Sequence, residues 1–396
     1  MRTRAALAFG AALVALLCFG LWLGGHPSKL PGFVRDIFVA EPAGLTAEAA
    51  ELIEDAYYRP VGETELSNAS LQGMVRELRR RHDDQFSEYF SPESLESFNQ
   101  QIEGRFTGIG LSVVPVKRGL RVTEVFPNSP AAGAGIAGGD TIVSVNGESI
   151  AGEPSGAATA KIKGPEGTEV TVGVRDGRSG KVREETMERA EVELPNVSSD
   201  LREIDGRKLG YVRLLSFSVG AHALLAEAVK KVQDEGAEGI VLDLRGNPGG
   251  LLDEAVSSAS VFLPEGEVVV STESRTQGDS VHETSGGNLP ALPTVVLIDR
   301  GTASAAEILT AALADNGDAT VVGTRSFGKG VFQEERDLAN GGALKLTVGE
   351  YFTPDGTNLA ESKGIHPDVK VSDNPRTRPD EALRRSLGLL AGQVGE

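Results

Sequence analysis

The sequence predicts a multidomain chain of mixed class, α+β in its first half and α/β in its second. The chain has 396 residues, more than the usual length of one domain. Residues 45–103 have a polar-rich pattern with helical spacing, and residues 104–190 form short strands with glycine at their turns. Residues 195–375 alternate between strand and helix patterns, which favours a parallel or mixed sheet with helices packed on it.

Residues 1–25 contain an apolar segment that predicts membrane association. Residues 5–23 carry no charge and follow Arg2 and Arg4. This run is long enough to span a bilayer, and the arginines would keep the amino terminus in the cytoplasm. A cleaved signal peptide has a shorter apolar core and a small-x-small exit, which is not clear here. We therefore expect a single-pass anchor in the cell membrane with the rest of the chain extracytoplasmic. The alternative is a secreted or periplasmic protein after signal cleavage.

Composition excludes several classes of partner and cofactor. The net charge of −18 is spread over the chain, which argues against nucleic acid or an anionic lipid surface as the main partner. The one cysteine, Cys18, lies in the apolar segment, so neither a disulfide framework nor a thiolate metal site is available. The patterns H-E-x-x-H and G-x-x-x-x-G-K-[ST] are absent, so we expect no metal and no nucleotide cofactor.

Residues 45–103 predict helices. Leu52 and Ala56 belong to one apolar face, and Leu71 and Val75 belong to another. The basic run at residues 79–82 is typical of a solvated helix end, where cations complement the helix dipole.

Residues 104–190 predict a separate module. The motif GIGL begins a strand, and SPAAGAGIAGGDTIVSVNG follows at residues 129–147. A loop of successive backbone N–H groups beside an open strand edge can hold a carboxylate while the edge pairs with a peptide. GIGL alone is most often a turn, but together with residues 129–147 it resembles a PDZ domain. The resemblance implies pocket walls at Ala158 and Ile162. It also implies a carboxylate-binding loop made of Gly108, Ile109, Gly110 and Leu111.

Three strand patterns of the last region run into loops that can carry chemistry. Residues 239–244 lead into RGNPGG, residues 294–298 into GTASAAE, and residues 320–322 toward GKG at residues 328–330. The carboxyl ends of parallel strands meet at one edge of a sheet, where open α/β folds build their sites. We therefore expect these loops to lie together.

Ser304 has both a structural and a catalytic interpretation. With Glu307 it fits a capping box at the start of a helix. As a nucleophile it would need a base, and Lys329 can be that base only when neutral. Desolvation lowers a lysine pKa, and the glycines beside Lys329 would let the backbone approach closely and enclose its stem. The helix amino terminus would offer the N–H of Ala305 to an oxyanion.

The motifs GTASAAE, GKGVFQ and DLRGNPGG resemble those of the carboxyl-terminal processing (tail-specific) peptidases. The resemblance implies a serine peptidase core in which Ser304 is the nucleophile, Lys329 the general base and Gln333 a residue that positions the lysine. It also implies a second oxyanion donor, the backbone N–H of Gly249 or Gly250. Many members carry a second serine where this chain has Ala306, which leaves the nucleophile position unaffected.

The resemblance covers residues 45–372 and implies a function. It implies a serine endopeptidase that cleaves extracytoplasmic proteins near their carboxyl termini, with the PDZ domain recognising the substrate terminus. The partners would be proteins or peptides with free carboxyl termini, and homo-oligomer formation is left open. Residues 376–396 are expected to form a charged tail with one helical segment at 381–390 and no assignable function.

The sequence disfavours two other hypotheses. A Ser/His/Asp site is disfavoured because none of the five histidines occupies a required position and the chain lacks a G-x-S-x-G elbow. An inactive scaffold that keeps only the peptide-binding groove is disfavoured because Ser304, Lys329 and Gln333 are all present.

Overall fold

The computed structural model describes residues 41–193, 196–287, 289–317, 319–373 and 380–395. They divide into two compact units between Ser91 and Pro92. The first unit contains α3 (Glu41–Ala56), α4 (Glu63–His82) and β1 (Glu88–Phe90). The predicted anchor lies outside the described residues, and within these ranges no helix is long and apolar enough to cross a membrane.

The second unit begins with α5 (Pro92–Ile102) and continues into the predicted strand-rich module. The strand order of its main sheet is β3-β4-β5-β7-β8, with β6 on β5, and β2 pairs separately with β9. The module's elements are β2 (Arg105–Gly108), β3 (Leu111–Val116), β4 (Gly119–Val125), α6 (Pro130–Gly133), β5 (Thr141–Val145), β6 (Glu148–Ser149), α7 (Ser155–Ile162), β7 (Glu169–Arg175), β8 (Val182–Glu188) and β9 (Ala190–Glu193). A core of its own, including Leu120, Ile142 and Val172, makes the module a separate packing unit.

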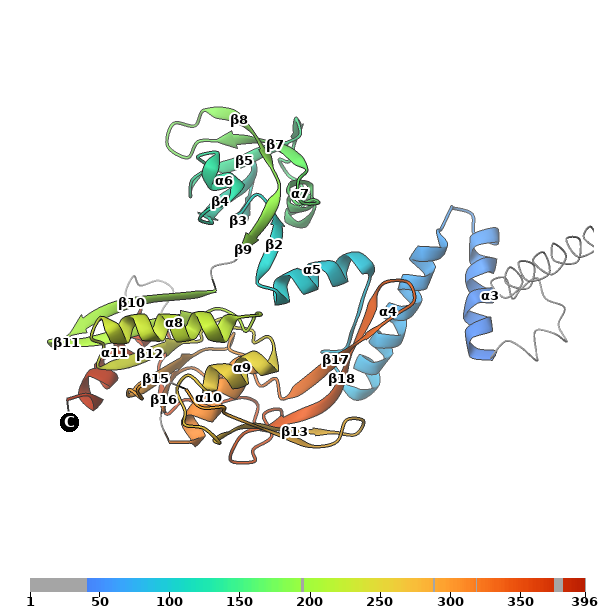
Figure 1. Ribbon diagram of the computed structural model, residues 1–396. Coiled ribbons are helices and arrows are strands. Elements are labelled where there is room, and N and C mark those ends of the chain that lie inside the picture. Colours follow the sequence, from blue (N-terminus) through green and yellow to red (C-terminus); the bar gives the residue numbers. More distant parts are fainter. Residues whose placement is uncertain (1–40, 194–195, 288, 318, 374–379, 396) are drawn as a thin grey trace, which may run out of the picture. The chain divides into compact units, whose positions relative to one another are not determined.

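A mixed sheet forms the centre of the remaining chain, in the order β10-β11-β12-β15-β16-β19. β10 runs antiparallel to β11, and the following neighbours are parallel. The sheet and its helices are β10 (Val197–Ile204), β11 (Arg207–Leu214), α8 (Ala221–Asp234), β12 (Gly239–Asp243), α9 (Leu252–Ala259), β15 (Thr294–Ile298), α10 (Ala305–Asp315), β16 (Ala319–Gly323), β19 (Val369–Lys370) and α11 (Glu381–Gln393). The predicted mixed α/β core is thereby confirmed (Figure 1).

Helices cover both faces of this sheet. On β12, Ile240 and Leu242 pack in the cluster with α8, α9 and α10, whereas Val241 packs in the cluster with α11. This burial on both faces explains the continuous apolar runs at residues 240–242 of β12 and 295–298 of β15. The helix expected at 381–390 extends over Glu381–Gln393. Its side chains Leu387 and Leu390 are buried in the core cluster on this face of the sheet. It is therefore part of the folded core.

A second, antiparallel sheet contains β13 (Val268–Ser274), β14 (Ser280–Glu283), β17 (Val331–Asp337) and β18 (Ala343–Phe352). β18 pairs with β13 and β17, and β13 also pairs with β14. A bulge in the β17–β18 pairing falls between Phe332 and Gln333, immediately after the lysine loop.

The three loops expected to converge leave one edge of the central sheet. β12, β15 and β16 are neighbours, parallel and in register, with Val241 beside Val295 and Val295 beside Thr320. Their carboxyl ends therefore lie side by side, and the chain segments 244–250, 299–304 and 324–330 start from there.

Candidate active site

Ser304 lies at a strained turn between β15 and α10. Its φ of 54° and ψ of −119° are unusual for a residue with a side chain. Such a conformation costs about 1–3 kcal/mol and persists only where the surroundings enforce it, often at functional sites. A sharp strand-to-helix turn of this kind presents the side chain of a nucleophile. The sequence lacks the glycine pattern that signals such an elbow, so this feature could not be predicted.

The carboxylate of Glu307 holds the turn and the lysine loop together. Its Oε2 accepts the backbone N–H of Ser304 at 2.8 Å and that of Lys329 at 2.9 Å. Its Oε1 accepts the N–H of Gly328 at 2.7 Å and the hydroxyl of Ser326. Glu307 is fully buried, so these charge-assisted bonds replace its hydration.

Glu307 therefore does more than cap a helix. The predicted bond from its side chain to the Ser304 backbone is formed, but the same oxygen also binds the Lys329 backbone. Ser304 and Lys329 are thus joined through one shared acceptor atom. The capping-box spacing identified the residue, but no local signal linked it to a loop beyond the next strand.

The surroundings of the Lys329 amine lower its pKa, which favours the neutral form that a general base requires. The pKa of Lys329 is lowered to about 8: burial contributes most, the charge of Lys345 acts in the same direction, and the charge of Glu307 opposes both. About one tenth of this amine is therefore unprotonated at pH 7, whereas a free lysine would be almost fully protonated.

Glycines on both sides of Lys329 pack against the backbone of residues 359–364. A Cβ atom at Gly330 would lie 2.0 Å from Ala360 N, and one at Gly328 would lie 2.7 Å from the Lys363 carbonyl carbon. The predicted close approach at these two positions is confirmed, and it fixes the path of the loop that carries Lys329.

Replacing Gly330 with alanine is expected to displace the lysine loop and lower kcat at least tenfold, because small misplacements of reacting groups are costly. The measurement is peptide hydrolysis together with thermal unfolding. Gly73→Ala is the matched control, since a Cβ at Gly73 meets nothing within 4 Å. Unchanged activity in Gly330→Ala would show that the loop tolerates the shift.

Replacing Lys345 with glutamine is expected to move the rising limb of the pH–activity profile to higher pH. The charge of Lys345 lowers the pKa of Lys329, so its removal raises that pKa and leaves less neutral amine at pH 7. The check is kcat/KM from pH 6 to 10, with Lys345→Arg as the charge-preserving control. A profile that stays in place in the glutamine variant rules out this electrostatic coupling.

The loop after β12 lies directly against the nucleophile. A Cβ atom at Gly249 would be 2.9 Å from both Ser304 Cβ and Ala305 N. The N–H of Gly249 donates to Asn247 Oδ1 at 2.9 Å, so Gly250 is the better candidate for the second oxyanion donor. Ala305 is the first residue of α10, which supports the prediction for its N–H.

Two polar side chains and one backbone hydrogen bond join this loop to the turn before Ser304. Asp299 Oδ1 accepts the N–H groups of Gly246 and Gly301 at 2.9 and 2.8 Å. The Thr302 hydroxyl donates to Leu244 O at 2.8 Å, and Asn247 O accepts the N–H of Ala303 at 3.0 Å. The sequence alone gives no indication of these bonds, because each joins two loops that are far apart in the chain.

Gln333 lies on β17, four residues after Lys329. Its amide nitrogen is 3.4 Å from Val331 O and 3.5 Å from Thr347 Oγ1, both long for hydrogen bonds. Its proposed effect on Lys329 stays a prediction. No group of three metal-ligating side chains lies within the described ranges.

The predicted carboxylate loop of the strand-rich module connects β2 to β3. Gly108 ends β2, Leu111 begins β3, and β3 lies at an edge of the sheet. The carbonyls of Ile109 and Gly110 accept the N–H groups of Ala131 and Phe126 at 2.8 and 3.0 Å, which fixes the loop. Ala158 and Ile162, the expected pocket walls, are buried in the module's core.

Comparison with known proteins matches two family models to the chain. The model for peptidase family S41 matches residues 208–371, and the PDZ domain model matches residues 97–175. The PDZ assignment made from the sequence is thereby confirmed.

Curated relatives cover most of the chain. A CtpA-like serine protease from Staphylococcus haemolyticus is 33% identical over 350 residues, covering 88% of this chain and 68% of the relative. One from Staphylococcus aureus strain N315 is 36% identical over 336 residues, covering 82% and 64% respectively. The chain thus spans about two thirds of the length of these relatives.

Solved structures share the fold. The photosystem II D1 C-terminal processing protease matches with a TM-score of 0.52 at 27% identity, covering 88% of this chain and 98% of that one. An S41 protease structure from Bacteroides fragilis matches with a TM-score of 0.56 at 19% identity, covering 81% and 90%, which indicates a common fold.

Proposed function

Because the chain belongs to peptidase family S41, we propose that it is a serine endopeptidase that cleaves extracytoplasmic proteins near their carboxyl termini. One observation supports this most directly: Ser304 and a lysine with a pKa of about 8 are bound through their backbones to the same buried carboxylate. The extracytoplasmic location rests on the apolar segment at residues 5–23.

In the proposed mechanism, neutral Lys329 takes the proton of the Ser304 hydroxyl as Oγ attacks the scissile carbonyl carbon. The oxyanion accepts hydrogen bonds from the N–H groups of Ala305 and Gly250. The Lys329 ammonium then protonates the leaving amine, which leaves an acyl-enzyme on Ser304. Lys329, again neutral, removes a proton from the water that attacks this ester and delivers it to Ser304 Oγ as the acyl group leaves. Gln333 orients the lysine.

Covalent labelling tests this proposal. A fluorophosphonate probe should label the native protein and leave Ser304→Ala unlabelled. Comparing proteomes of cells carrying either form should reveal shortened carboxyl termini only with the native protein. A native protein that neither reacts with the probe nor cleaves any chain end would instead be the inactive scaffold.

The PDZ module is proposed to select substrates by their carboxyl termini. The edge strand β3 offers backbone pairing, and the fixed loop before it offers a carboxylate site. Amidating a peptide substrate's terminus should lower kcat/KM by about one to two decades, because one charged hydrogen-bonded contact is worth about 1.5–3 kcal/mol. The check compares free and amidated forms of a peptide ending in an apolar residue. Equal rates would remove the PDZ module from substrate selection.

A further inference from the structure

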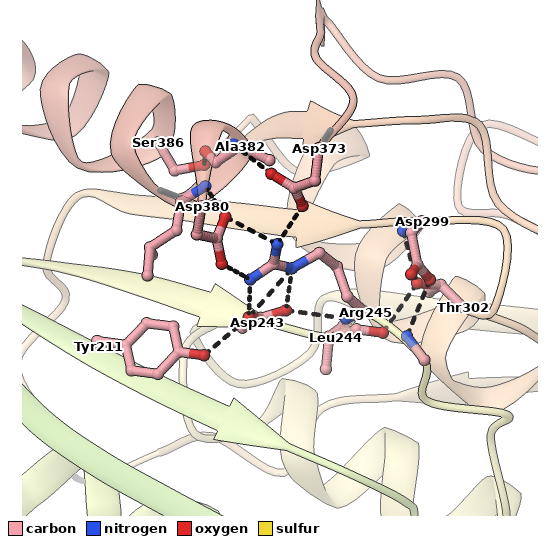
Figure 2. A network of polar contacts seen from close by, with 12 residues as sticks. Tyr211, Asp243, Leu244, Arg245, Asp299, Thr302, Asp373, Asp380, Ala382 and Ser386 are labelled. Carbon is pink, nitrogen blue, oxygen red and sulfur yellow. Dashed lines mark hydrogen bonds and ion pairs between the residues drawn. The ribbon is translucent and has the colours of Figure 1, made fainter. Parts of the chain in front are cut away.

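Three carboxylates surround the guanidinium of Arg245 (Figure 2). This residue lies two positions after the end of β12. Its Nη2 donates to Asp243 Oδ2 at 2.7 Å and to Asp380 Oδ2 at 2.8 Å. Its Nη1 donates to Asp373 Oδ2 at 2.7 Å and to Asp380 Oδ1 at 3.0 Å. Asp243 is fully buried and also accepts the hydroxyl of Tyr211 at 2.8 Å. Arg245 is therefore held in one orientation from both sides.

Two of these carboxylates also hold the start of the last helix. Asp380 is the N-cap of α11 and accepts the N–H of Leu383 at 2.8 Å, and Asp373 accepts the N–H of Ala382 at 2.9 Å. Negative charge is favourable at a helix amino terminus. The helix start and Arg245 thus share the same pair of carboxylates, and one cannot shift without disturbing the other.

Arg245 begins the loop that carries the candidate oxyanion donor. Gly246 is bound to Asp299, Asn247 accepts the N–H of Ala303, and Gly249 lies against Ser304. Because Arg245 and Gly246 are adjacent, a displacement of Arg245 would act on the bonds that join this loop to Asp299 and Ala303, and through them on the backbone that faces Ser304.

We propose that α11 is a positioning element of the active site, in which Asp373 and Asp380 hold Arg245 and thereby place the Gly250 N–H for the oxyanion. The carboxylates act through Arg245 and contact no substrate. This inference rests on the proposed peptidase function. It goes beyond that function in assigning to α11 the placement of the loop at residues 245–250.

The test is the double variant Asp373→Asn, Asp380→Asn in the full chain. Asparagine keeps the size and the N-capping ability of aspartate and removes its charge. We expect kcat to fall about tenfold with KM changed less than about twofold, because transition-state contacts are lost while substrate binding is kept. Amide hydrogen exchange should become faster at residues 246–250, while β12 stays protected.

Glu238→Gln is the matched control. Like Asp373 and Asp380, Glu238 accepts both an arginine, Arg207 at 2.7 Å, and a backbone N–H, that of Lys208 at 3.2 Å, and it is similarly exposed. It should leave kcat and loop exchange unchanged. If the double variant loses thermal stability but keeps native kcat and native exchange at residues 246–250, the carboxylates only anchor the helix and the proposal is overturned.

The exchange measurement separates this inference from the proposed function. A native protein without Ser304-dependent hydrolysis would refute the peptidase assignment, whereas faster exchange confined to the loop would still support coupling between α11 and Arg245. Unchanged exchange refutes the coupling whatever the activity.

Discussion

Lys329→Arg is expected to lower kcat/KM by about three orders of magnitude while the fold is kept, because general base catalysis contributes about that much. Guanidinium cannot be deprotonated in a protein, so arginine keeps the charge and loses the base. In the native enzyme, kcat/KM should rise about tenfold per pH unit up to the pKa of about 8 and then level off. The arginine variant should show no such rise. Substantial activity in this variant would remove Lys329 from the mechanism.

Lys329→Met tests the same pKa through stability. The folded-state pKa of about 8 lies below the ordinary value of 10.5, so folding disfavours the protonated lysine. Native stability should therefore rise with pH between about 8 and 10.5, and this rise should be missing in the methionine variant. Unfolding temperatures measured from pH 6 to 11 give the difference. Parallel curves for the two proteins would contradict the lowered pKa.

Glu307→Gln is expected to reduce both activity and stability. The glutamine has one acceptor oxygen for the four donors that now bind the carboxylate, and its NH2 group faces N–H groups that also donate. We expect a loss of about 3 kcal/mol in the free energy of unfolding. We also expect a fall in kcat of about a hundredfold, because the turn and the lysine loop lose their shared acceptor.

The remaining activity should have a distinct pH dependence. The charge of Glu307 raises the pKa of Lys329, so its removal should move the rising limb to lower pH, opposite to the shift expected for Lys345→Gln. Glu254→Gln is the matched control, since this buried glutamate accepts the N–H groups of Gly220 and His222 at 2.8 and 2.9 Å. It should lose stability and keep native kcat well below its unfolding temperature. If Glu307→Gln behaves like this control, its role is limited to stability.

The sequence by itself determined the order of the elements and predicted which loops leave one edge of the central sheet. The strands at 239–243 and 294–298 can be recognised because burial on both faces produces the continuous apolar runs 240–242 and 295–298, and the loops that follow parallel neighbours share a sheet edge. Ser304, Lys329 and Gln333 were identified because the resemblance rests on short contiguous motifs. Their catalytic roles remain predictions, as does the anchor at residues 5–23.

Tertiary structure alone decided how these parts are joined. The positive φ of Ser304, the double role of Glu307, the bond from Gly249 to Asn247 and the ion pairs of Arg245 with Asp373 and Asp380 were not predicted. Helix α11 was expected to be a tail and is part of the core. Periodicity and spacing report only on neighbours along the chain. Apart from the bond between Gly249 and Asn247, these features depend on contacts between segments up to 135 residues apart, and only the folded sheet brings those segments together.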